Sequence, residues 1–295
     1  MLENFPTEKS CIEHLEKMRW PKGIVCPCCG SCRKVYHVSR GEGYKCADCR
    51  KMFSVRKGTI FEESRLPLRQ WFAAAFLLTS NRKGISSCQL AREIGVTQKT
   101  AWFMLGRLRE VAGAMGAIGG PISGIVEADE TYLGGKEKNK HFDKKLHEGR
   151  GPSGKQAVIG ARERGGRVKT KMIPNTEKDQ LHDFIKQNVV AGSKLYTDDH
   201  RSYLGLKDYD HESVNHSMRE YVRGQAYTNG IESFWALLKR GYYGVFHHFT
   251  WKHLPRYLAE FETRWNMGQL SQESRLDSLL GHSSGMRLTY KGLVA

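Results

Sequence analysis

The spacing of hydrophobic and polar positions divides the chain into three stretches. Residues 1–60 carry few aliphatic side chains and many cysteines, and short alternating runs there predict small strands. Residues 61–118 have apolar positions three or four apart, which predicts helices, the first of them ending near Asn81. Five glycines and a proline between Gly113 and Gly124 then predict a linker. From residue 122 to 285, the pattern switches between strands and helices.

The third stretch predicts a particular order of elements. Strands are expected at 124–133, 156–162 and 167–173. A helix is expected after a Thr176–Asp179 capping box. Two further strands at 193–197 and 212–216 and a final helix at 231–241 are expected to follow. This is the order of a ribonuclease-H-like domain, in which a three-strand meander is extended by parallel crossovers. We therefore predict an α/β protein in which a ribonuclease-H-like catalytic domain follows the two smaller segments.

Three acidic residues stand where this order would bring them together. The first and fourth strands lie side by side at the centre of such a sheet, so Asp129 would meet Asp198, and the later helix would add Glu232. Glu232 lies at the margin of the apolar stripe of its helix, where an ordinary surface glutamate would fit equally well. The neighbouring acids that compete with the two strand positions are Glu127, Glu130 and Asp199.

The chemistry that would use three such carboxylates is phosphodiester cleavage or transfer. Two Mg²⁺ ions about 4 Å apart can stabilise the attacking and leaving oxygens around a phosphate. Mg²⁺ prefers carboxylate oxygens and keeps several waters, so three acids suffice as ligands, and Mn²⁺ can substitute. Lys239 follows Glu232 by seven residues on the same helix face, from which it would contact a DNA phosphate.

Cysteines are concentrated near the N-terminus, where six of the eight lie between positions 26 and 49. The two Cys-x2-Cys pairs are Cys26 with Cys29 and Cys46 with Cys49. Pairs at this separation can place four thiolates around one tetrahedral Zn²⁺, whose binding would supply folding energy to a stretch with few aliphatic residues. Cys28 and Cys32 are additional, so the register of the ligands can shift, and an iron–sulfur site is a further alternative. We predict a zinc ribbon with structural Zn²⁺.

Residues 85–104 have the pattern of a helix-turn-helix. Ala91 lets two helices approach, and Gly95 suits the sharp turn between them. The side chains at the start of the second helix, where base edges are read, are Thr97, which would also cap it, and Gln98, Lys99 and Thr100. Arg107 follows on the same helix and is a further expected DNA contact. An ordinary helical hairpin is the alternative.

The charge balance agrees with a polyanionic partner. The 295 residues include 47 Lys or Arg and 31 Asp or Glu, a formal net charge of +16. Seven basic residues lie in a predicted insertion loop, 136–155. The longest apolar run has eight residues, too few to span a membrane, and the first ten residues do not resemble an export signal. We therefore expect a cytoplasmic protein that binds nucleic acid and not a membrane.

Four histidines fit no single assignment. His247, His248 and His253 lie within seven residues but share no helix face, so DNA contacts or core hydrogen bonds are favoured over another metal site. His216, in the predicted fifth strand, would lie near the acids.

Several segments resemble the bacterial insertion-sequence transposases of the ISXO-like DDE group, which also carry an N-terminal zinc ribbon. The similar segments are Val-Glu-Ala-Asp129-Glu-Thr-Tyr-Leu-Gly-Gly-Lys, Tyr-Thr-Asp198, Val214-Asn-His-Ser, Thr228-Asn-Gly-Ile-Glu232-Ser-Phe-Trp with the following Lys239-Arg240-Gly, and Gly244-Val-Phe-His-His. The resemblance covers nearly the whole chain. It implies a transposase that binds terminal inverted repeats, cleaves the strand ends and joins the 3′-OH to target DNA.

The resemblance also implies roles for individual residues. Asp129, Asp198 and Glu232 would be the catalytic acids, Lys239 the accompanying base, and Arg240 a further DNA contact. Because two ends must be held together, at least two protomers are expected on the DNA. The rival hypotheses are a DNA-binding regulator with a repurposed nuclease-like domain, and a structure-selective nuclease that cleaves without joining.

Overall fold

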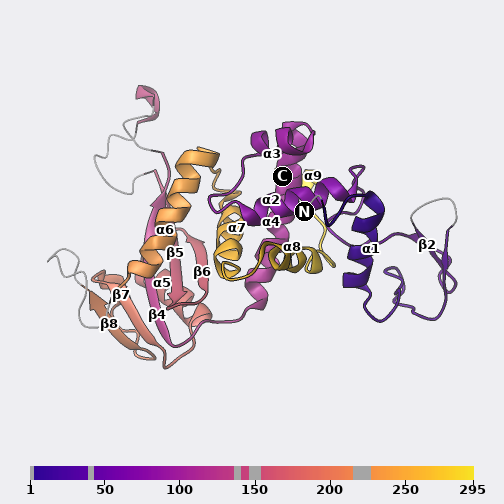
Figure 1. Ribbon diagram of the computed structural model, residues 1–295. Coiled ribbons are helices and arrows are strands. Elements are labelled where there is room, and N and C mark those ends of the chain that lie inside the picture. Colours follow the sequence, from indigo (N-terminus) through magenta and orange to yellow (C-terminus); the bar gives the residue numbers. More distant parts are fainter. Residues whose placement is uncertain (1–2, 39–42, 136–140, 146–153, 215–226) are drawn as a thin grey trace. The chain divides into compact units, whose positions relative to one another are not determined.

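The computed structural model describes residues 3–38, 43–135, 141–145, 154–214 and 227–295 (Figure 1). The chain splits into two compact units. The first contains Met1–Asn81, Ile85–Met115 and Leu270–Ala295, and the second contains Arg82–Gly84 and Gly116–Gln269. The sequence predicts borders at 60, 118 and 285 between segments of different function. The division into compact units does not test these borders, so they stay predictions.

The N-terminal part of the first unit is a small three-stranded sheet preceded by a helix. Helix α1 (Glu8–Arg19) begins after Thr7, whose hydroxyl accepts a hydrogen bond from the backbone of Ser10. Its sheet is antiparallel, in the order β1 (Val35–His37), β2 (Tyr44–Cys46), β3 (Met52–Phe53). The hydroxyl of Tyr44 donates to Glu16 Oε1 at 2.8 Å and so links the sheet to α1.

The rest of the first unit is helical. Its helices are α2 (Leu68–Ser80), α3 (Ser87–Ile94), α4 (Gln98–Ile118), α8 (Gln272–Gly281) and α9 (Tyr290–Val294). Gly95 adopts a left-handed φ of 68° between α3 and α4, as the turn between two helices requires, and the assignment of a DNA-binding helix-turn-helix stays a prediction. The spacing of Leu276, Leu279 and Leu280 on α8 places all three in the same core as α2 and α4.

The second unit is built on a five-stranded mixed sheet. Its strands are β4 (Ile125–Leu133), β5 (Gln156–Glu163), β6 (Val168–Ile173), β7 (Lys194–Asp198) and β8 (Asp210–Val214), in the order β6-β5-β4-β7-β8. The first three pair antiparallel, whereas β7 is parallel to both β4 and β8. The predicted α/β class is therefore confirmed. The expected fifth strand lies at 210–214, and His216 falls outside the described residues.

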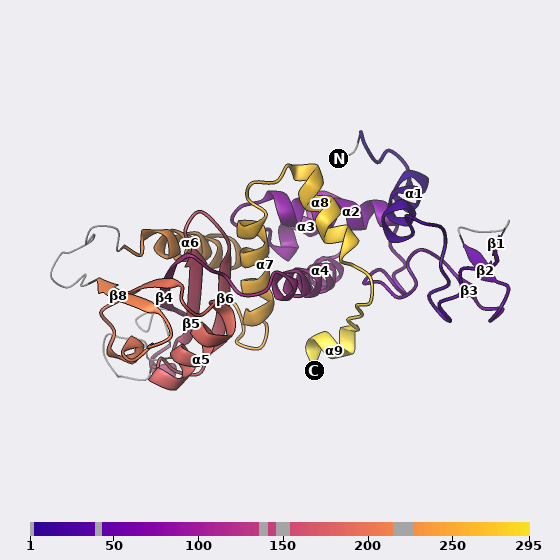
Figure 2. The same ribbon diagram turned by 90° about the horizontal axis from the view of Figure 1, so that it is seen from below.

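Helices cover both faces of this sheet (Figure 2). Helix α5 (Lys178–Asn188) packs on one face, and α6 (Asn229–Gly241) and α7 (Leu254–Asn266) pack on the other. Val126 and Ala128 point toward α5, so alternation turns Asp129 toward α6. A π-helical turn, Tyr242–Phe246, extends α6. Two short 3₁₀ turns, Phe142–Lys144 and Arg201–Tyr203, lie in loops.

The predicted capping box at Thr176 is wrong. Helix α5 begins after Glu177, which makes no side-chain cap, and the Thr176 hydroxyl lies 3.2 Å from the hydroxyl of Tyr132 on β4. A tertiary partner therefore replaces the local cap. Most of the predicted basic loop, 136–155, lies outside the described residues. None of the described helices has the length and hydropathy to span a membrane.

Candidate functional site

A cluster of carboxylates lies where β7 ends, beside the middle of β4. The parallel register pairs Glu127 with Tyr196, so two residues further on Asp129 comes level with Asp198. Oxygens of Asp129, Glu130 and Asp198 all lie within 4.8 Å of one another. Asp199, the alternative considered from the sequence, is not in this group. The strand order thus brings two of the three predicted acids together.

Glu130 joins the cluster although its strand position pointed away from Asp129. Its Oε2 accepts a hydrogen bond from the hydroxyl of Tyr203 at 2.9 Å, and Tyr203 is fully buried beside α5. Asp198 Oδ1 accepts the backbone N–H of His200 at 3.2 Å. Strand alternation alone could not reveal Glu130, because the length of its side chain and the position of Tyr203 bring its carboxylate to the end of the sheet.

The cluster concentrates negative charge on three half-buried residues. Burial raises the pKa of Asp129 to about 8, and the charges of Glu130, Asp198 and Glu232 add to the effect. The pKa of Glu130 is also raised, by burial and then by Asp198. A divalent cation would relieve this repulsion, and carboxylate oxygens are ligands that hard cations prefer. The donor set therefore fits a divalent metal ion.

Glu232 lies in the first turn of α6 and is exposed. Its carboxylate is not among the three that lie within 4.8 Å of one another, although its charge acts on Asp129. One of its oxygens accepts the hydroxyl of Thr228 at 3.1 Å. Lys239, half-buried, and Arg240, exposed, lie about two turns further along the same helix. The structure thus places the third predicted acid beside the cluster and leaves its role a prediction.

Trp235, which sequence reasoning did not select, connects α6 to the cluster. Its indole N–H donates to Asp129 Oδ2 at 3.0 Å. Gly160, the partner of Asp129 on β5, makes room for this contact, because a Cβ there would lie 2.7 Å from the indole ring. Sequence periodicity identified Trp235 only as part of an apolar stripe, since nothing local reveals the partner of its N–H.

The four predicted cysteines of the ribbon converge. The sulfur atoms of Cys26, Cys29, Cys46 and Cys49 lie within 4.8 Å of one another. The Cys26–Cys49 and Cys29–Cys46 pairs are each 3.7 Å apart. Zn–S bonds of about 2.3 Å at tetrahedral angles require sulfurs about 3.8 Å apart, so this arrangement fits structural Zn²⁺. Cys28 and Cys32 are outside the group, although the backbone N–H of Cys28 donates to the sulfur of Cys26 at 3.4 Å.

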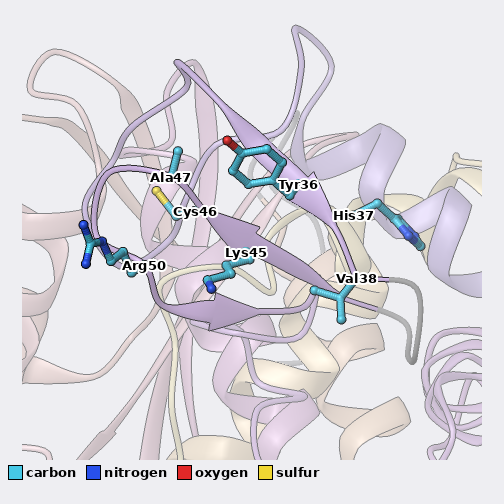
Figure 3. Close-up of a pocket in the computed structure, with 7 residues that line it drawn as sticks. All are labelled: Tyr36, His37, Val38, Lys45, Cys46, Ala47 and Arg50. Carbon is cyan, nitrogen blue, oxygen red and sulfur yellow. The ribbon is translucent and has the colours of Figure 1, made fainter.

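The ribbon also has a hollow of about 570 Å³ lined by basic, aromatic and small side chains (Figure 3). Its lining residues are Tyr36, His37, Val38, Lys45, Cys46, Ala47 and Arg50. Tyr36 is 49% exposed, and the Lys34 ammonium lies 5.2 Å from the centre of its ring. No acidic residue lines the hollow among the described residues, so its charge suits an anion.

Four of the five helix-turn-helix residues predicted to contact DNA lie at the start of α4, and the fifth, Arg107, lies further along the same helix. Thr97 caps α4 as predicted, accepting the backbone N–H of Thr100 at 3.2 Å. Gln98 donates to Ser87 at 2.8 Å, and the Lys99 ammonium lies 4.8 Å from the ring of Tyr290. Thr97, Gln98 and Lys99 are exposed, and Thr100 is half-buried.

Arg107 requires a correction. It is 6% exposed, and its guanidinium donates to the backbone carbonyls of Leu288 at 2.9 Å, Ile60 at 2.7 Å and Glu62 at 3.0 Å. These bonds satisfy a buried cation and connect three segments of the first unit. The side chain does not extend to the surface, so we remove Arg107 from the expected DNA contacts.

The described histidines lie outside the close groups of metal-ligating side chains. Among the described residues, the groups of three or more close metal-ligating side chains are the four cysteines and the Asp129 cluster. His253 Nδ1 lies 3.3 Å from an Arg256 nitrogen on α7, and the backbone N–H of His248 donates to Phe246. The His253 contact is a local side-chain hydrogen bond, whereas the His248 bond is made by its backbone, so the role of the exposed His248 imidazole stays a prediction.

The Cys₄ ribbon in one unit suits structural zinc, and the acidic cluster on the mixed sheet in the other suits a divalent cation. The family described as the ISXO2-like transposase domain matches residues 121–266, and the transposase zinc-ribbon domain matches residues 6–52. The chain belongs to this family of DDE transposases with a zinc ribbon.

Two curated relatives carry names that refer to transposable elements or transposases. An uncharacterised protein in the transposable element ISH50 of Halobacterium salinarum is 28% identical over 257 residues, which is 81% of this chain and 84% of the relative. An uncharacterised transposase-like protein of Haemophilus influenzae is 34% identical over 117 residues, which is 39% of this chain and 94% of the relative.

Proposed function

We propose that this chain is a DNA transposase that binds the terminal inverted repeats of its element, cleaves the strand ends and transfers the 3′-OH to target DNA. The observation that carries the proposal is the meeting of Asp198, at the end of β7, with Asp129, in the middle of the adjacent parallel strand β4. Close carboxylates whose pKa is raised by burial and by each other's charge are typical of functional sites, and phosphoryl transfer with divalent cations uses such a group. The family match supports the same activity.

The catalytic domain is a ribonuclease-H-like fold in this proposal. The support is the strand order β6-β5-β4-β7-β8, with β4 central, β5 antiparallel to it and β7 parallel to it. This is the meander extended by parallel crossovers that the sequence pattern predicts. The crossover through α5 between β6 and β7 completes the agreement.

The metal ligands in this proposal are Asp129, Asp198 and Glu232, with Glu130 beside them. Two Mg²⁺ ions, for which Mn²⁺ can substitute, would supply Lewis-acid stabilisation of the attacking and leaving oxygens of the phosphate. Asp129 must give up its proton to bind a cation, and Trp235 holds its carboxylate in place. Lys239, as the accompanying base, and Arg240 would contact the DNA backbone from α6.

Double-stranded DNA is the partner that both units would bind. The first turn of α4, with Thr97, Gln98, Lys99 and Thr100, would enter a major groove, and the hollow on the ribbon would contact phosphates. The net charge of +16 favours both contacts. Two ends must be joined in one reaction, so at least two protomers act together, and the place of action is the nucleoid in the cytoplasm.

A strand-transfer assay tests the proposal. Labelled duplexes that carry the inverted repeats flanking the gene are incubated with Mg²⁺, supercoiled target DNA and either wild type or Asp129→Ala. Joined products with wild type and none with the variant are expected. End binding without any cleavage by wild type would instead support a DNA-binding regulator. Cleavage without joining, even on pre-cut ends, would support a nuclease.

A further inference from the structure

One buried acid near the site has no part in the proposed metal binding. Glu127 lies on β4 two residues before Asp129 and on the same strand face. Its side chain is completely buried. A buried carboxylate is costly unless it is paired and hydrogen-bonded, so its contacts indicate what it does.

Glu127 supplies the cap that α6 lacks. Thr228, the residue before α6, makes no side-chain cap to the helix backbone, and its hydroxyl donates to Glu232. Glu127 Oε2 accepts the backbone N–H of Ile231, in the first turn, at 3.0 Å. The first N–H groups of a helix have no partner within the helix, and a negative charge is favoured there. An oxygen from the sheet therefore fixes the start of the helix that carries Glu232.

The surroundings of Glu127 are built for this close approach. Gly230 has no side chain where a Cβ would lie 1.5 Å from Arg162 Nη1 and 2.5 Å from Glu127 Oε2. Arg164 Nε is 3.3 Å from Glu127 Oε1, and Arg162 Nη1 is 3.8 Å from Oε2. The Arg164 guanidinium in turn lies 3.8 Å from the ring centre of Tyr227. Two cations thus balance the buried charge and hold its orientation.

Helix α6 is attached to β4 at two points one turn apart. At the first, Glu127 accepts from the backbone of Ile231, and at the second, Trp235 donates to Asp129. Two attachments fix both the position of the helix along its axis and its rotation, which one attachment cannot do. The geometry of Glu232 relative to Asp129 depends on both quantities.

We propose that Glu127 is a positioning residue, whose carboxylate sets the first turn of α6 and thereby places Glu232 for metal binding with Asp129 and Asp198. This inference rests on the proposed function for the role of the three acids. The contacts of Glu127 stand independently of it.

Two conservative variants separate positioning from charge. Glu127→Gln keeps an oxygen of the same reach toward Ile231 and removes the charge, whereas Glu127→Asp keeps the charge and withdraws the oxygen by one methylene. The matched control is Glu262→Ala on α7, which also removes a buried carboxylate that accepts a backbone N–H, that of Thr170 at 2.9 Å. Three readouts are needed: Mn²⁺ affinity by calorimetry, amide hydrogen exchange of a peptide covering 229–235, and strand transfer.

Positioning predicts that Glu127→Asp is the more damaging change. Its Mn²⁺ affinity should fall about tenfold or more, as for other groups that orient metal ligands, and exchange in 229–235 should accelerate. Glu127→Gln leaves Arg162 and Arg164 without the charge that balances them, so its melting temperature should fall. The Mn²⁺ affinity of the folded protein should nevertheless stay within about threefold of wild type, because the hydrogen bond to Ile231 survives. Glu262→Ala should lower the melting temperature and leave the Mn²⁺ affinity of the folded protein unchanged.

A lower Mn²⁺ affinity in Glu127→Gln than in Glu127→Asp would overturn the proposal in favour of a purely electrostatic role. Equal affinity in both variants and wild type would also overturn it, as would an equal loss of affinity in Glu262→Ala. Failure of wild type to join strands, together with the predicted order of Mn²⁺ affinities, would reject the transposase activity and leave the positioning role standing.

Discussion

The indole N–H of Trp235 on α6 donates to the Oδ2 oxygen of Asp129 on β4 at 3.0 Å. An aromatic side chain in an apolar stripe thus holds the carboxylate at the centre of the acidic cluster. Such a bond leaves Asp129 one defined orientation, and oriented ligands bind metal more tightly than mobile ones. The indole itself sits over the space that Gly160 leaves open.

Replacing Trp235 by Phe removes this bond and keeps most of the apolar bulk. We expect strand transfer and Mn²⁺ affinity to fall about tenfold or more, with a stability loss of about 1–2 kcal/mol. Phe234→Leu, a neighbouring change in the same core, should cost comparable stability without changing Mn²⁺ affinity. Unchanged metal affinity in Trp235→Phe would show that the bond does not organise the site.

Asp129→Asn should make the protein more stable at alkaline pH when zinc occupies the ribbon and no divalent cation is supplied to the acidic cluster. The pKa of Asp129 is about 8 in the folded protein, against about 3.9 in the unfolded chain. The folded state therefore holds the extra proton between these values, and wild type loses stability as the pH rises from about 4 to about 8. The variant has no such proton, so its advantage should grow over this range to at least about 1 kcal/mol above pH 8.

Urea denaturation of both proteins at a series of pH values measures this difference. Addition of Mn²⁺ should reverse the order at pH 8, because the ion binds folded wild type and not the variant. A pH-independent difference would contradict the assigned protonation of Asp129.

Cys46→Ser should abolish zinc binding by the ribbon. Its sulfur lies 3.7 Å from that of Cys29 within the four-sulfur group, whereas Cys32 lies outside it. Elemental analysis should find one zinc per chain in wild type and in Cys32→Ser, and none in Cys46→Ser. Limited proteolysis of Cys46→Ser should cut within residues 24–53, since the ribbon has only a small core without metal. Full zinc content in this variant would refute the ligand assignment.

Lys99 and Arg107 should respond in opposite ways to replacement by Ala. Lys99 lies at the start of α4, so Lys99→Ala should weaken binding to DNA, reduce the slope of its salt dependence by about 1, and leave stability unchanged. Arg107→Ala leaves three backbone carbonyls without a donor and should cost about 2–4 kcal/mol of stability. Fluorescence anisotropy at several salt concentrations and thermal denaturation distinguish the two effects.

Much of the candidate site could be predicted from the sequence, because its contacts are determined by residue spacing within short segments or by the order of the strands. Two Cys-x2-Cys turns bring their own sulfurs together, and the remaining step is to pair the turns. Asp198 could be identified because it ends a short apolar strand and a parallel neighbour fixes its level. Thr97 caps its helix through a bond to a residue three positions away. In each case the decisive contact lies within a few residues or follows from the strand order.

Contacts between segments far apart in the sequence could not be predicted, because they depend on how the folded elements pack. Arg107 resembles a surface cation until the carbonyls of Leu288 and Ile60 surround it, 181 and 47 residues away. Glu127 and Trp235 are ordinary members of an alternating strand and an apolar stripe, and only the packing of α6 on β4 gives them partners. Thr176 likewise exchanges its expected local cap for Tyr132. The spacing of apolar residues predicts which face of a helix or strand is buried, but it does not predict which residues that face contacts.

The first unit is interrupted by the second, and this has a consequence for biosynthesis. Leu276, Leu279 and Leu280 complete the core around α2 and α4, so that core cannot close until the whole intervening unit has left the ribosome. A nascent or prematurely terminated chain would hold the ribbon and the helix-turn-helix on an unfinished scaffold. Such fragments would expose the apolar faces of α2 and α4 that the leucines of α8 cover in the whole chain.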